Sequence, residues 1–142
     1  MMTKEDLRRL QVLQNSIMRV ETSSSYDEPV ASLLAKTKQL SIHQKIAYYT
    51  LNQVYNISKY KAPAYHHRRL FGGGTTLSIN TRSARNFESR VEFDTSVARG
   101  SFFYQASRLW SSIPLEMKEA RTLQIFKKMA RKWTEENILR TP

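Results

Sequence analysis

Clusters of arginine and lysine are the residues of this chain whose types and spacing indicate chemistry. The sequence HHRR at residues 66–69 ends in Arg68 and Arg69, and a second basic group lies near the C-terminus. The second group consists of Lys127, Lys128, Arg131 and Lys132. Grouped guanidinium and ammonium groups bind phosphate oxygens through charge-assisted hydrogen bonds. The two groups therefore predict contacts with a polyanion.

Two further arginines, Arg82 and Arg85 in the sequence TRSAR, complete the set of candidate nucleic-acid-binding residues. The chain has 23 Lys and Arg residues against 12 Asp and Glu residues, which gives a formal net charge of +11 at pH 7. Such an excess favours nucleic acid or an acidic membrane surface as a partner. The alternative for each single cation is a solvated surface position without a ligand.

The acidic residues do not form a catalytic pattern. Nucleotidyl transfer by two metal ions needs carboxylates that hold ions about 3.5–4 Å apart. The acidic pairs Asp27–Glu28 and Glu135–Glu136 instead fall at predicted helix ends. The sequence lacks GxSxG and HExxH, and its GGG lacks the GxxxxGK[ST] pattern of a phosphate-binding loop. We expect a protein that is not an enzyme and that has no cofactor and no small-molecule ligand.

Cysteine is absent, which removes disulfides and thiolate zinc sites, and three histidines alone do not complete a metal site. No stretch reaches the roughly 20 apolar residues of a membrane span. The start MMTKEDLRRL is charged where a signal peptide is apolar. We therefore expect an intracellular protein, in the nucleus or the cytoplasm, without a membrane partner.

Apolar residues at helical spacing predict three helices in the first half of the chain. Thr3, with Asp6 three residues later, predicts the start of the first helix, and Ser41 predicts the start of a long third one. The predicted core face of the first helix is Leu7, Leu10, Leu13, Ile17 and Val20. Between these helices, a short one begins near Pro29 and turns Val30, Leu33 and Leu34 inward. The long helix buries Ile42, Ile46, Tyr49, Val54 and Ile57, broadened by Tyr48, Leu51 and Tyr55.

Two helices are predicted near the C-terminus. Ser101 and Thr122 are their caps, and Pro114 ends the first of them because it disfavours helical backbone at the residue before it. Their apolar faces are Phe102, Ala106, Leu109, Trp110 and Ile113, and then Leu123, Phe126, Ala130 and Trp133. Most of the aromatic residues here are therefore expected in the core.

Together these segments predict a mainly α-helical single domain over residues 1–142 with about five helices. Residues 3–71 and 101–139 are expected to be helical, with a proline-initiated turn or short helix in KAPAYHHR. The periodicity fails in residues 72–100, so we expect an insertion there that is irregular or a β-hairpin around 75–97. TTLSI and RVEFDTSV are the candidate strands.

Five segments follow one another from Leu7 to Trp133. They are LRRLQVLQNSIMRV, LSIHQKIAYYTLNQVYN, KAPAYHHR, TRSAR and ARGSFFYQASRLWSSIPLEMKEARTLQIFKKMARKW. In this order they resemble the C-terminal segment of non-LTR (LINE-type, Jockey-like) retrotransposon reverse transcriptases. In that family a helix reading LQxxQNxxxR follows the polymerase thumb, and SFxxxAPRLWNSLP precedes an FKxxLK helix.

The sequence departs from the family pattern in two places. Glu21 and Ser23 stand where the family has an apolar or small residue and Thr-Gly. The catalytic turn of the family, an aromatic residue followed by Ala-Asp-Asp, belongs to the palm and does not occur in this sequence. The chain therefore resembles a detached tail of the polymerase, either a truncated element or a gene derived from one.

The resemblance implies binding or positioning of template RNA or target DNA beside a reverse transcriptase core. Some relatives use a Cys/His knuckle for this, which this sequence lacks, so arginines and lysines would contact phosphates while Tyr65 or Tyr104 stacks on bases. We expect non-catalytic, sequence-tolerant binding of RNA or DNA. One alternative is a helical protein-interaction module that packs on a polymerase thumb or another partner. The other is a truncated element remnant without selected function.

Overall fold

The computed structural model describes residues 3–71 and 102–139, and these residues form helices joined by short connections. The helices are α1 (Lys4–Thr22), α2 (Val30–Thr37), α3 (Ile42–Tyr60), α4 (Ala64–Phe71), α7 (Phe102–Ser112), α8 (Leu115–Lys118) and α9 (Leu123–Asn137). No strand occurs in these two ranges. The predicted mainly α-helical fold class is confirmed. The short helix α8 was not predicted, and the predicted insertion around 75–97 lies outside the described residues.

The helix starts are fixed by the residues that the sequence predicts as caps. In α1, the Thr3 hydroxyl accepts the backbone N–H of Asp6 (3.2 Å), and the Asp6 carboxylate accepts that of Thr3 (2.9 Å). Ser41 and Gln44 form the same reciprocal pair at the start of α3. Each pair satisfies backbone donors that the first turn of a helix leaves without a partner. The predicted cap at Ser101 lies outside the described residues.

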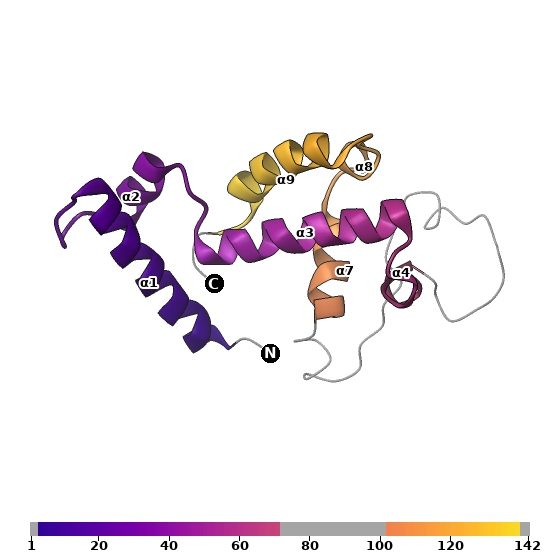
Figure 1. Ribbon diagram of the computed structural model, residues 1–142, viewed down its shortest axis with the longest axis horizontal. Coiled ribbons are helices and arrows are strands. Elements are labelled where there is room, and N and C mark those ends of the chain that lie inside the picture. The colour runs from indigo at the N-terminus through magenta and orange to yellow at the C-terminus, as the bar shows by residue number, and fades with distance from the viewer. Residues whose placement is uncertain (1–2, 72–101, 140–142) are drawn as a thin grey trace.

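Helix α3 is the centre of the arrangement. It contacts α1, α4, α7 and α9, and α2 packs against α1. Figure 1 shows α9 along one side of α3 and α7 on the other, with α1 and α2 at its N-terminal end and α4 at its C-terminal end. Helices α9 and α4 therefore lie on different sides of α3.

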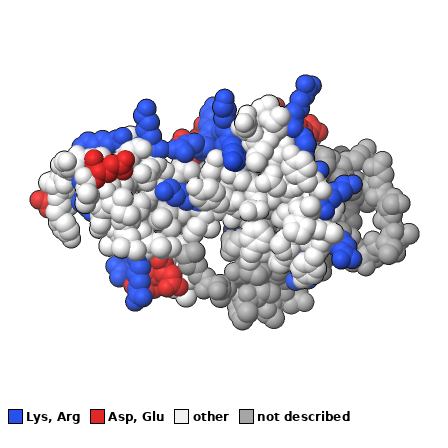
Figure 2. All heavy atoms as spheres, viewed as in Figure 1, with Lys and Arg blue, Asp and Glu red and all other residues white. Residues whose placement is uncertain are grey.

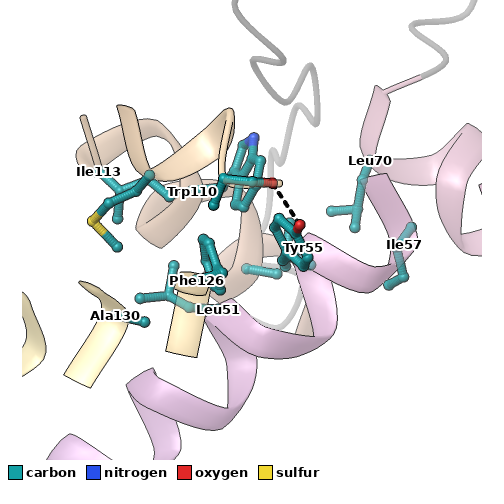
Figure 3. Packing of buried hydrophobic residues seen from close by; sticks show 12 residues of the cluster. Leu51, Tyr55, Ile57, Leu70, Trp110, Ile113, Phe126 and Ala130 are labelled. Atoms are coloured by element: carbon teal, nitrogen blue, oxygen red, sulfur yellow. Dashed lines mark hydrogen bonds between the residues drawn. The ribbon is translucent and has the colours of Figure 1, made fainter. Parts of the chain in front are cut away.

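The larger core lies between α3, α4, α7, α8 and α9. Figure 3 shows the rings of Tyr55, Trp110 and Phe126 meeting there. Tyr55 stacks on Phe126 with ring centroids 4.5 Å apart, and Trp110 lies 6.0 Å from Phe126. Both Trp110 and Phe126 are fully buried. The expected core roles of the aromatic residues Trp110 and Phe126 are confirmed.

The apolar stripe of α1 faces solvent, and the prediction for it was wrong. Ile17 is 64 % exposed, whereas its neighbour Met18 is 0 % exposed. We call the exposed residues the α1 stripe: Leu10, Leu13, Ile17 and Val20. Met18 packs with Leu33 and Leu34 in a second, smaller core cluster between α1 and α2.

Two glutamines explain why α1 turns its apolar stripe outward. Gln14 is buried, and its Nε2 donates to the carbonyl oxygen of Leu40 (2.8 Å). The Oε1 of Gln11 accepts the backbone N–H of Ile42 (2.9 Å). These amides supply partners to the backbone that joins α2 to α3, and unpaired polar backbone is costly when buried. The inward face of α1 is therefore partly polar.

Three further residues of the predicted core faces lie at the surface in this structure. Ile46 and Tyr49 on α3 are exposed, and Leu51 and Tyr55 fill the core instead. On α7, Phe102 is exposed as well. In each case the neighbouring helices cover only part of the apolar face, so the residues at its edge are exposed to solvent.

Candidate nucleic-acid interface

The four predicted cations of α9 share the exposed side of that helix. We call them the α9 basic surface: Lys127, Lys128, Arg131 and Lys132. Phe126, Ala130 and Thr134 recur every four residues and are buried against α3, and the four cations on the opposite side of the helix are exposed. Figure 2 shows Lys and Arg side chains along the upper edge of the molecule, over α2, α8 and α9. The helical segment of α9 is about 22 Å long at about 1.5 Å per residue.

Arg131 differs from the three lysines because its guanidinium is already engaged. It donates a hydrogen bond to the carbonyl oxygen of Lys38, which follows the last turn of α2. It also forms an ion pair with Glu135 one turn along α9 (3.5 Å). The lysines of the α9 basic surface form no salt bridge in the part of the chain that the structure describes. Their ammonium groups are the ones left for an external anion.

A cavity of about 460 Å³ opens beside Arg131, between the end of α2, the start of α3 and α9. It is lined by Leu34, Ala35, Lys38, Gln39, Leu40, Gln44, Arg131 and Glu135. The wall combines two cations, one carboxylate and two amides with apolar side chains. It extends the polar surface of α9 towards α2.

The structure adds three cations that sequence spacing did not select. Lys38 is joined to α9 through its carbonyl bond with Arg131, across 93 residues of sequence. Lys59 of α3 donates a hydrogen bond to the carbonyl oxygen of Arg121, just before α9. These contacts bring Lys38 to one flank of α9 and Lys59 to its start, where Arg121 already lies in sequence. No local signal in the sequence indicates such long-range neighbours.

Arg68 and Arg69 are exposed on α4, away from the α9 basic surface. The Arg69 guanidinium lies over the ring of Phe103, 5.6 Å from its centroid, which is a cation–π contact between α4 and α7. The predicted arginines and the predicted α9 cations therefore form two separate groups. Arg82 and Arg85 lie outside the described residues.

Rings from α4 and α7 surround Phe103, and we call this group the aromatic cluster: Tyr65, His66, Phe102 and Phe103. His66 lies 5.5 Å and Tyr65 6.3 Å from Phe103, both in edge contacts. Phe102 lies 5.6 Å from Phe103. At the next residue of α4, burial lowers the pKa of His67, and the charge of Lys61 lowers it further.

One residue of each acidic pair forms an ion pair at or near a helix end. Glu28 accepts hydrogen bonds from Lys36 and from the hydroxyl of Ser32 (2.8 Å), and Glu135 pairs with Arg131. Within residues 3–71 and 102–139, no group of three His, Asp or Glu side chains is placed to hold a metal ion. None of the helices described is long and apolar enough to cross a membrane.

Comparison of the chain with family models, curated proteins and solved structures gave no match. The resemblance to the retrotransposon tail therefore rests on the order of the quoted segments and stays a prediction.

Proposed function

We propose that this chain is a non-catalytic, sequence-tolerant nucleic-acid-binding protein that resembles the C-terminal region of a retrotransposon reverse transcriptase. One observation carries the proposal. Lys127, Lys128 and Lys132 are exposed together on α9 and have no carboxylate partner among the described residues. Ammonium groups without a carboxylate partner contact phosphates without reading base sequence. The net charge of +11 adds a long-range attraction to any polyanion.

The proposal is tested by titrating single-stranded RNA and duplex DNA at several salt concentrations. Each contact with a duplex phosphate contributes about −0.9 to the slope of log K against log salt, so three lysines contribute about −2.7. The triple variant Lys127→Ala, Lys128→Ala, Lys132→Ala is expected to flatten the slope by that amount. Circular dichroism checks that α9 stays folded.

A matched triple variant removes the same charge from α1: Lys4→Ala, Arg8→Ala and Arg9→Ala. A defined surface on α9 predicts a much smaller change in slope for this control. An equal loss in both variants would mean that binding is diffuse attraction to a charged protein. A flat salt response in the parent protein would contradict the proposal outright.

The second candidate function is a protein-interaction module, and the α1 stripe favours it. Four large apolar side chains stand in solvent along one side of α1. Exposed apolar surface of this kind is typical of a binding face. By the resemblance, the occupant would be the polymerase thumb that precedes this helix in the family. This reading predicts weak nucleic-acid binding, together with self-association or apolar-dye binding that is lost in Leu13→Ser, Ile17→Ser.

A further inference from the structure

Tyr65 and the two arginines of α4 lie on one side of the same helix. Arg68 and Arg69 follow Tyr65 by three and four residues, and side chains at these separations are neighbours about 5–6 Å apart on a helix surface. All three side chains are exposed, Tyr65 by 62 %. An aromatic ring is thus placed one turn before two guanidinium groups.

The ring of Tyr65 is held in position without being covered. It meets Phe103 edge-on and His66 at a tilt of 58°, so neither ring is stacked parallel on it. Phe103 is half-buried and packs against the larger core, which anchors the aromatic cluster. Phe102 is exposed beside Phe103 and adds a second accessible ring.

Within the aromatic cluster, one ring packs against the core and two rings are exposed to solvent. Phe103 contacts the core and receives the cation–π contact from Arg69. Tyr65 and Phe102 are the exposed rings of the cluster. Rings of this kind, next to cations, are the elements with which proteins hold single strands, since a base stacks on the ring and the cation contacts the phosphate.

We infer that Tyr65 and Phe102, with Arg68 and Arg69, form a stacking site for single-stranded nucleic acid, distinct from the α9 basic surface. The inference rests on the proposed function and adds a substrate class to it. A base pair in a duplex keeps its faces stacked on its neighbours, so duplex DNA does not use this site. Because every base has a stacking face, the site is tolerant of sequence.

The test compares a single-stranded oligonucleotide with an abasic one of the same length and phosphate number. Stacking is lost without the bases, whereas phosphate contacts remain. Each stacked base is expected to raise the affinity for the base-bearing strand over that for the abasic strand by about 5- to 150-fold. Tyr65→Ala and Phe102→Ala should each reduce this ratio and leave the affinity for the abasic strand and for duplex DNA unchanged. Oligo(U) and oligo(dT) arms show whether RNA or DNA is preferred.

Tyr49→Ala is the matched control, because Tyr49 is 60 % exposed on α3 and has no arginine one turn away. Its ratio should equal that of the parent. A base-to-abasic ratio near one in the parent overturns the stacking site while leaving the proposed function intact. A ratio that falls equally in Tyr49→Ala also overturns it. Absence of any binding by the parent overturns both.

Variants at the two sites should change different measurements. The triple lysine variant of α9 should lower the salt slope and keep the base-to-abasic ratio. Tyr65→Ala should lower the ratio and keep the salt slope. Tyr65→Phe retains the ring, so its base-to-abasic ratio should equal that of the parent. A ratio as low as that of Tyr65→Ala would contradict stacking as the mechanism.

Discussion

The hydroxyl of Tyr55 donates a hydrogen bond to the carbonyl oxygen of Ala120 at 2.6 Å, and this bond joins α3 to the connection between α8 and α9. Figure 3 shows it as a dashed line beside Trp110. Tyr55 and Ala120 are both buried, so water does not replace the bond if it is lost. The contact fixes the start of α9, and with it the position of the α9 basic surface.

Tyr55→Phe should therefore lower the free energy of unfolding by about 1–3 kcal/mol, the usual result when a buried carbonyl loses its partner. Urea denaturation measures the change. Tyr49→Phe removes an exposed hydroxyl and should change stability by less than about 0.5 kcal/mol. Equal stability of the two variants would mean that the Ala120 carbonyl finds another partner.

Trp110→Ala should lower the free energy of unfolding by about 3–5 kcal/mol, because the fully buried indole is replaced by a cavity. The control is Ile125→Ala, at an exposed position of α9, with a change of about 0.5 kcal/mol or less. An unfolding midpoint that barely moves in Trp110→Ala would contradict the burial of this ring.

Substitutions at two adjacent residues test which face of α1 is buried. Met18→Ala should cost about 2–5 kcal/mol, since Met18 is fully buried against α2. Ile17→Ala should be nearly neutral in the free energy of unfolding, because Ile17 lies in the exposed α1 stripe. Thermal or urea unfolding distinguishes them. If Ile17→Ala were the more destabilising of the two, the predicted stripe would face the core after all.

Arg131 and Lys132 are neighbours on α9 with different expected effects. Arg131→Ala should lower stability by about 0.5–1 kcal/mol, because it removes the bond to the Lys38 carbonyl and the ion pair with Glu135. Lys132→Ala should leave stability unchanged and weaken only the binding of polyanions. Unfolding and salt titration of both variants check this. Identical stability of the two variants would mean that the link between α9 and α2 contributes nothing to the free energy of unfolding.

Acid should weaken the protein through Glu28. Hydrogen bonds from Lys36, then Ser32 and Ser24, lower the pKa of Glu28 from 4.5 to about 2. A carboxylate with a lowered folded-state pKa stabilises the fold above its unfolded value, and this contribution is lost as the pH falls from about 4.5 to about 2.

Both Glu28→Gln and Lys36→Gln should therefore reduce the acid dependence of the unfolding midpoint in that window. The first variant removes the titrating group, and the second removes the largest cause of its shift. An unchanged acid profile in both variants would contradict the role of this ion pair.

The starts of α1, α3 and α9 follow from the sequence alone. Thr3, Ser41 and Thr122 accept backbone N–H groups from residues three positions later, so their role depends only on local chain geometry. Pro114 likewise ends α7 locally, since the helix stops at Ser112. The exposed position of the α9 basic surface follows from the same local spacing.

Only the tertiary structure decided which part of each apolar face is buried. The hydrophobic effect has no direction, so the spacing of Leu13 and Ile17 gives a stripe without saying which helix covers it. Gln11 and Gln14 face inward on α1 because the backbone 26 or more residues away needs their amides. That requirement arises only when α1, α2 and α3 pack together. The same holds for Arg131 and Lys38, which lie 93 residues apart and meet through a single backbone carbonyl.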